Sequence, residues 1–189
     1  MRSYFSLLLA AGLLLPVIAA AEAPAGWFLA GTDPTAYKVS RDASVTHDGK
    51  KSASLTSIGA SKGFGTLMQA FVPRDYRGKR VRLSAWVKAS DVKDWAGVWM
   101  RVDGADKKVL SFDNMQSRAI KGTKEWSRYE VVLDVGDSAT NVAFGLLLSG
   151  EGTLWISGIS MQPVDKSVPT TSPSLNDVSQ EPKNLDFAQ

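Results

Sequence analysis

Residues 95–104 read WAGVWMRVDG, and the side chains of this stretch alternate between two kinds. One set is aliphatic and the other is aromatic or charged: Ala96, Val98, Met100 and Val102 against Trp95, Trp99, Arg101 and Asp103. Successive side chains of a β-strand point to opposite faces of the sheet. The stretch therefore predicts a strand that already has a core face and carries its tryptophans on the other face.

Three further stretches divide in the same way, namely KRVRLSAWVK (79–88), KVLSFDN (108–114) and WSRYEVVLDV (126–135). In the second of them we expect Leu110 and Phe112 to face the core and Asp113 to face away. If the four strands share one sheet, its far face is aromatic, polar and charged at once. The residues expected there are Arg82, Trp86, Trp99, Arg101, Asp103, Asp113 and Glu130.

Turn-forming stretches such as HDGKK, PRDYRGKR and SGEG recur every 8–14 residues between short apolar runs. Short strands at this spacing favour an all-β sandwich of antiparallel sheets. The strands are expected over 37–46, 51–58, 64–72, 79–90, 95–103, 107–114, 126–135, 141–149 and 153–162. We predict one β-sandwich domain over residues 26–163.

Both ends of the chain differ in composition from this domain. Residues 1–21 combine a basic start, an apolar run and small residues, which is typical of a signal peptide cleaved after Ala21. Residues 164–183 are rich in Pro, Ser and Thr, and we expect a disordered linker there. Residues 184–189, NLDFAQ, are apolar enough that we hypothesise docking as a strand. We expect a periplasmic or secreted bacterial protein without a membrane anchor after cleavage.

Composition excludes several classes of function. The formal net charge of +3 is too balanced, and the charges too scattered, to indicate nucleic-acid binding. There is no Cys and one His, so no zinc or copper constellation can be recognised. We expect no cofactor and no metal site. His47, in THDGK, is interpreted as a solvent-exposed turn residue.

Residues 26–163 resemble the galactose-binding-domain-like jelly rolls, which include many carbohydrate-binding modules. The resemblance rests on YKVSRDASVTHDGKKSASL, RLSAWVK, WSRYEVVLDV and LWISGISM. It implies a jelly-roll β-sandwich of two antiparallel sheets. A closer resemblance, through GFGTLMQ, WAGVWMRVDG and FDNMQ, is to a bacterial domain of unassigned activity. Ser157 and Gly158 stand where many such modules hold a calcium-binding acidic pair, so we expect no calcium site there.

The aromatic and polar residues indicate binding of a carbohydrate or a similar small polar ligand. The C–H faces of sugars stack on aromatic rings, and their hydroxyls bond to polar side chains. The candidate ligand-binding residues are Trp99, Arg101, Trp86, Arg82, Asp113, Asn114, Gln69 and Gln116.

Three alternatives remain open at this stage. A loop such as 113–124 could cover the tryptophans, or the same face could bind an envelope protein, since Trp and Arg are frequent at interface hot spots. The third alternative is a glycoside hydrolase that pairs two of Asp103, Asp113 and Glu130. The balance favours a non-catalytic binding protein, with no catalytic residue assigned.

Overall fold

The structure is a computed structural model that describes residues 23–172. Within them the chain forms strands and three single-turn 3₁₀ helices, at Pro34–Ala36, Ala105–Lys107 and Gln116–Arg118. The strands are β1 (Phe28–Gly31), β2 (Tyr37–His47), β3 (Lys50–Ser57), β4 (Phe64–Phe71), β5 (Lys79–Asp103), β6 (Val109–Asp113), β7 (Ile120–Val135), β8 (Asn141–Ser149) and β9 (Thr153–Val164). No helix among the described residues is long and apolar enough to cross a membrane.

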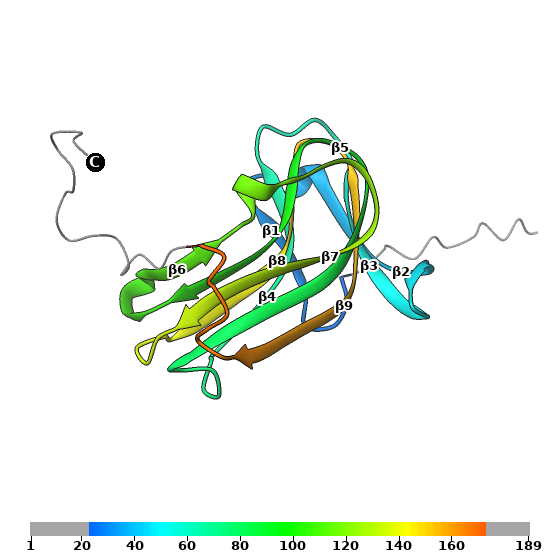
Figure 1. Ribbon diagram of the computed structural model, residues 1–189. Coiled ribbons are helices and arrows are strands. Elements are labelled where there is room, and N and C mark those ends of the chain that lie inside the picture. The colour runs from blue at the N-terminus through cyan, green and yellow to red at the C-terminus, as the bar shows by residue number, and fades with distance from the viewer. Residues whose placement is uncertain (1–22, 173–189) are drawn as a thin grey trace, which may run out of the picture.

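All described strand pairs are antiparallel, and the sheet folds over on itself into two layers (Figure 1). The first layer has the order β2-β3-β9-β5-β7 and uses residues 79–90 of β5. The second has the order β1-β4-β8-β5-β6 and uses residues 95–103 of the same strand. Strand β5 therefore belongs to both layers of a jelly-roll sandwich.

The bend in β5 reverses the alternation of its side chains. Register shifts between Val87 and Ala96 interrupt its pairing with β7. Before the bend the residues that enter the main core have odd numbers, and after it they have even numbers: Val81, Leu83, Ala85 and Val87, then Val98, Met100 and Val102. Because both sets enter one core, the two outward-facing sets of β5 point to opposite sides of the molecule.

The core between the layers is aliphatic. Leu83, Leu133, Leu146 and Leu154 come from four different strands and are almost fully buried in one cluster. Burial of side chains of this size contributes about 1.5–3 kcal/mol each. The chain has no cysteine, so this core and the strand ladders supply the stability of the domain.

The expected fold class, an all-β jelly-roll sandwich, is confirmed, and most strand boundaries agree within two residues. Two expectations were wrong in detail. The segments 79–90 and 95–103 form one bent strand, and β7 begins at Ile120, six residues before the expected start. The short strand β1 was not expected, because four residues do not establish an alternation.

Residues 165–172 form an ordered strap, although the sequence placed them in a disordered linker. The strap, coloured orange to red, runs from the end of β9 toward β6 (Figure 1). Arg80 Nη1 donates to the backbone oxygens of Lys166 and Val168, both at 2.7 Å, and Thr171 N donates to Val132 O. The rest of the expected linker, the expected signal peptide and residues 184–189 lie outside the described residues.

Candidate functional site

The outer face of the second layer carries an open groove of about 330 Å³, here called the Trp99 groove. It crosses the full width of this layer, because β1, β4, β8, β5 and β6 all contribute to it. Its lining residues are Ala30, Gly31, Thr32, Phe64, Thr66, Met68, Trp99, Arg101, Phe112 and Leu147.

Trp99 forms the floor of the groove and is fixed in place. The residue is 7% exposed, and Nε1 donates a 2.7 Å hydrogen bond to Thr66 Oγ1. Thr66 Oγ1 in turn donates to Leu146 O at 2.9 Å. The polar atom of the indole is thus satisfied inside the protein, and the ring offers only its apolar surface to the groove.

Apolar side chains surround this floor on the outside of the sandwich. Phe64, Met68, Trp95 and Leu147 pack with Trp99 in a cluster separate from the main core. Phe112, on β6, borders the groove and is 40% exposed. An aromatic and aliphatic surface left open to solvent on a sheet face is typical of a binding site.

The groove becomes polar along β5 in the direction of Asp103. Arg101 Nε lies 2.9 Å from Asp103 Oδ1, and Asn141 Nδ2 donates to Asp103 Oδ2 at 3.1 Å. The Arg101 side chain is 45% exposed, whereas that of Asp103 is 7% exposed. The buried carboxylate therefore holds and neutralises the guanidinium, whose remaining N–H groups can donate to a ligand.

A second depression continues the surface at this polar end, and Arg101 lines both. The added lining includes Thr140, Asn141 and the 3₁₀ turn at Ala105–Lys107. The outer face of the second layer thus joins an aromatic floor to directional polar groups within one continuous surface. This combination is the general composition of a site for a small polar ligand.

The first layer turns a different aromatic cluster outward, and this one is closed. The ring centroids of His47 and Trp86 lie 4.2 Å apart with planes inclined by 24°, and Trp126 lies 5.3 Å from His47. The His47 side chain is 14% exposed, so the expectation of a solvent-exposed turn residue was wrong. The stack occupies the face of Trp86 that a sugar would need, and it ties the β2–β3 hairpin to the sheet.

Asp42 anchors the same hairpin to β9. Its carboxylate accepts hydrogen bonds from the amide and hydroxyl of Ser44, from Val45 N and from Trp155 Nε1. These bonds, with the Ser44 hydroxyl foremost, lower the pKa of Asp42 from 3.8 to about 2. Trp155 is therefore a structural donor at this position.

The charged residues of the first layer bind one another. Glu130 lies 3.3 Å from Arg82 Nε and 2.9 Å from Arg128 Nη2. Arg80 forms a bidentate pair with Asp134, and its hydrogen bond lowers the pKa of that carboxyl. The strap crosses this end of the face and binds Arg80. Arg82 and Trp86 thus have partners within the chain and lie on the opposite side of the molecule from Trp99.

Asp113 points inward, contrary to expectation, and holds the edge of the sandwich together. Its side chain is 5% exposed. Arg118 donates to both of its oxygens, at 3.0 and 2.6 Å, and Met115 N and the Thr171 hydroxyl donate to it as well. Ser111 is also buried and Phe112 is exposed, so the faces of residues 111–113 are the reverse of those expected, whereas Leu110 packs against the core as expected.

The remaining candidates lie away from the groove. Asn114 and Gln116 border a shallow depression with Thr171 and Ser172, and Asn114 Oδ1 accepts a hydrogen bond from Gln116 N. Gln69 lies on the inward side of β4, as Leu67 does, with its amide beside Gly26. Of the eight candidates, the structure brings only Trp99 and Arg101 together in the Trp99 groove.

The three carboxylates considered for hydrolysis are separated in the same way. Asp103 lies on the outside of the second layer, Glu130 on the outside of the first, and Asp113 inside the edge. No two of them flank a common space. Among residues 23–172, no three His, Asp or Glu side chains gather where they could hold a metal ion.

The expectations from sequence missed Phe64, Thr66, Met68 and Leu147. The stretch GFGTLMQ (63–69) held the signal, because Phe64, Thr66 and Met68 alternate with Gly65 and Leu67. Both sets are apolar in part, so alternation alone did not reveal which set faces outward. The register of β4 against β8 decides it.

No known protein-family profile matches this chain. An uncharacterised HTH-type transcriptional regulator of Bacillus subtilis (strain 168), YbfP, is 40% identical to it over 167 residues. The match covers 87% of this chain and 57% of the regulator, so this chain spans little more than half the length of that relative.

Solved structures share the fold at low sequence identity. The xylan-binding domains CBM22-1 and CBM22-2 of Paenibacillus barcinonensis Xyn10C superpose with TM-scores of 0.57 and 0.53, at 15% and 10% identity. These matches cover 77% and 74% of this chain and 90% and 92% of those domains. The enzymatically active domain of tailspike protein 4 from bacteriophage CBA120 gives 0.58 at 14% identity, over 74% of this chain and 20% of its own. The chain therefore has the jelly-roll fold of carbohydrate-binding modules.

Proposed function

We propose that this protein is a non-catalytic carbohydrate-binding domain and that its ligand lies in the Trp99 groove. The observation that carries this proposal is the pairing of a fixed indole floor with Arg101 at an open surface. An apolar sugar face can stack on Trp99, while ring hydroxyls bond to Arg101 and to Asn141. Because Asp103 neutralises Arg101, an uncharged sugar fits the groove better than an anionic one.

The comparisons support this proposal in two ways. The xylan-binding domains share the fold, although their low identity leaves the position and chemistry of the ligand open. The Bacillus subtilis relative is a regulator of the helix-turn-helix type. Residues 23–172 of this chain contain no α-helix, so this part of the chain contains no recognition helix for DNA. A domain found both in a regulator and in this chain is best understood as the part that senses a ligand.

We also propose that the protein is exported, on the basis of residues 1–21. The test is the N-terminal mass of the protein recovered from the extracellular or periplasmic fraction of its native host. Cleavage after Ala21 yields a chain that starts at Glu22. Recovery of the intact chain from the cytoplasm alone would overturn export and leave the binding proposal standing.

A glycan array, followed by titration calorimetry on the best ligand, tests the binding proposal. Arg101→Ala removes an exposed hydrogen-bond donor, and Trp99→Phe reduces the aromatic surface at the floor of the groove. Each is expected to weaken binding by about 10–100-fold. Trp86→Ala is the matched control, because it removes a tryptophan from the opposite face. Binding that survives both groove variants, or that is lost only in the control, would move the site to the first layer.

A protein ligand is the alternative occupant of the same face. Phe28 on β1 and Phe112 on β6 are 46% and 40% exposed at the two edges of the second layer. Exposed aromatic residues at sheet edges are common in protein interfaces. This alternative would be favoured if the glycan array showed no binding, if a purified envelope protein bound saturably, and if Arg101→Ala weakened that binding.

A further inference from the structure

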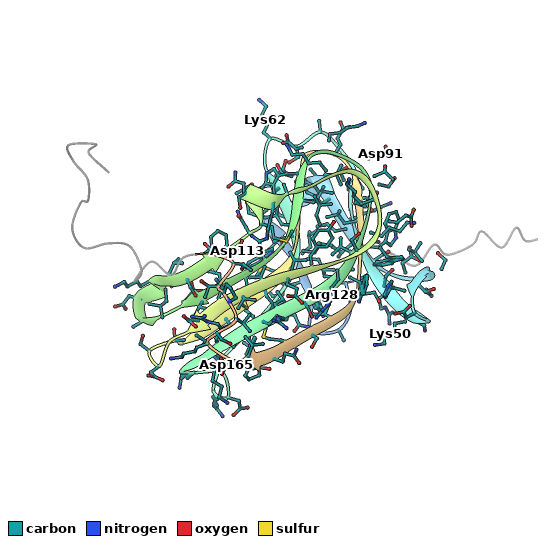
Figure 2. The ribbon with its side chains drawn as sticks, viewed as in Figure 1. Lys50, Lys62, Asp91, Asp113, Arg128 and Asp165 are labelled. Carbon is teal, nitrogen blue, oxygen red and sulfur yellow. The ribbon has the colours of Figure 1, made fainter. Side chains whose placement is uncertain are left out.

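A separate pocket of about 380 Å³ lies where β5 bends, at the end of the sandwich; we call it the apex pocket. It is bounded by the end of β3, the loop that follows it, the bend of β5 and the β8–β9 turn. Figure 2 shows Asp91 and Lys62 at this end of the molecule. The apex pocket shares no lining residue with the Trp99 groove.

The walls of the apex pocket are held by bonds between segments far apart in sequence. Ser57 N donates to Gly152 O at 3.0 Å, and Gly152 N donates to Ser57 Oγ at 3.0 Å. Lys93 N donates to Glu151 O at 3.0 Å, and Asp91 N donates to Thr123 Oγ1 at 3.1 Å. Backbone bonds of this kind fix the outline of the pocket before any ligand arrives.

The lining is polar and carries charges of both signs. Asp91 and Glu151 supply carboxylates, Lys93 supplies an ammonium group, and Thr56 and Thr153 supply hydroxyls. The Ser90 hydroxyl donates to Asp91 Oδ2 at 3.1 Å. Within residues 23–172 none of these three charged groups is in an ion pair. No aromatic side chain lines the pocket, so it offers nothing for a sugar ring to stack on.

We propose that the apex pocket binds a small zwitterion such as a free amino acid. The ammonium group of the ligand would face Asp91 and Glu151, and its carboxylate would face Lys93 and the hydroxyls. Charge-assisted hydrogen bonds of both signs select such a molecule over a neutral sugar of the same size. The site is independent of the carbohydrate proposed for the Trp99 groove.

The glycines of the domain provide a blocking variant and a matched control. A Cβ added at Gly59, in the apex pocket, would meet no atom within 4 Å, and the same holds for Gly136 in the β7–β8 turn. Gly59→Leu therefore adds a bulky side chain at a lining position of the pocket with no clash of its Cβ, while Gly136→Leu adds the same side chain elsewhere. Gly152 is unsuitable, because its Cβ would lie 2.9 Å from Val92 Cα.

The test is nuclear magnetic resonance titration of the full chain with the common L-amino acids, one at a time, to about 10 mM. A ligand of this size is expected to bind with a Kd of about 1 mM. Alanine amide and N-acetylalanine, which each lack one charge, should bind at least tenfold more weakly than alanine. Gly59→Leu should abolish binding, Lys93→Ala and Glu151→Gln should weaken it about tenfold, and Gly136→Leu should leave it unchanged.

The proposal is overturned if no amino acid shifts the resonances of the apex pocket. It is also overturned if the singly charged analogues bind as well as alanine, or if Gly59→Leu binds like the original chain. Binding of glycans at the Trp99 groove is measured separately, so either proposal can fail without the other.

Discussion

Replacing Asp113 by alanine is expected to destabilise the domain more than any surface substitution, because four donors converge on this carboxylate. The change removes both bonds to Arg118, leaves Met115 N without an acceptor and releases Thr171 of the strap. The Asp113 side chain is 5% exposed and that of Arg118 is 35% exposed. Removing one partner of a buried ion pair costs about 3–5 kcal/mol. Arg118 can regain water, so we expect the lower end, about 3 kcal/mol.

Urea unfolding and thermal melting measure this loss. For a domain of this length, about 3 kcal/mol corresponds to a fall in Tm of about 6–12 °C. Asp75→Ala is the control, because Asp75 is exposed and its side chain forms no ion pair or hydrogen bond within residues 23–172; it should change the free energy of unfolding by less than about 0.5 kcal/mol. Asp113→Asn keeps an acceptor for Met115 N and should fall between the two. A loss below about 1 kcal/mol in Asp113→Ala would refute the assigned role of this carboxylate.

Two further predictions concern the hairpin and the C-terminal segment. The pKa of Asp42 is lowered from 3.8 to about 2, so its stabilising effect is complete above about pH 4 and is lost as the pH falls toward 2. Because Asp42 is partly exposed, Asp42→Asn should cost only about 1–2 kcal/mol at neutral pH, and the difference should vanish near pH 2 in acid titrations of unfolding. Deleting residues 184–189 should lower the Tm or abolish a dimer, as measured by calorimetry and sedimentation; an unchanged value of both would remove the hypothesis that this segment docks as a strand.

Two residues of the candidate site, Trp99 and Arg101, could be inferred from the sequence of a single strand. In WAGVWMRVDG the even positions already supply a core face, so Trp99 and Arg101 had to point outward, and they do. The site could not be completed from sequence. In GFGTLMQ both alternating sets include apolar residues, and so Thr66 and Met68 gave no sign of belonging to the groove.

Other assignments failed because they needed knowledge of pairing between strands. Asp113 was expected outside because the neighbouring Leu110 and Phe112 are apolar, yet Arg118 and Thr171 draw the carboxylate inward. His47 was interpreted as an exposed turn residue, because nothing in THDGK reveals that the hairpin folds back onto Trp86. The contacts of Trp86 with His47 and of Thr171 with Asp113 join segments that lie far apart in the sequence.

The sequence by itself determined most of the strands, the aliphatic core and the all-β class, because alternation and turn residues are local properties of the chain. It also indicated that Trp86, in residues 79–90, and Trp99, in residues 95–103, face away from the core, although we expected them on one face of two separate strands. Only the tertiary structure decided that these sets face opposite sides of the molecule. The physical reason is the bend of β5 between its two layers. Register shifts against β7 occur at this bend, so the core-facing residues have odd numbers before it and even numbers after it. Residues that share a pattern in sequence are thereby separated by the full thickness of the sandwich.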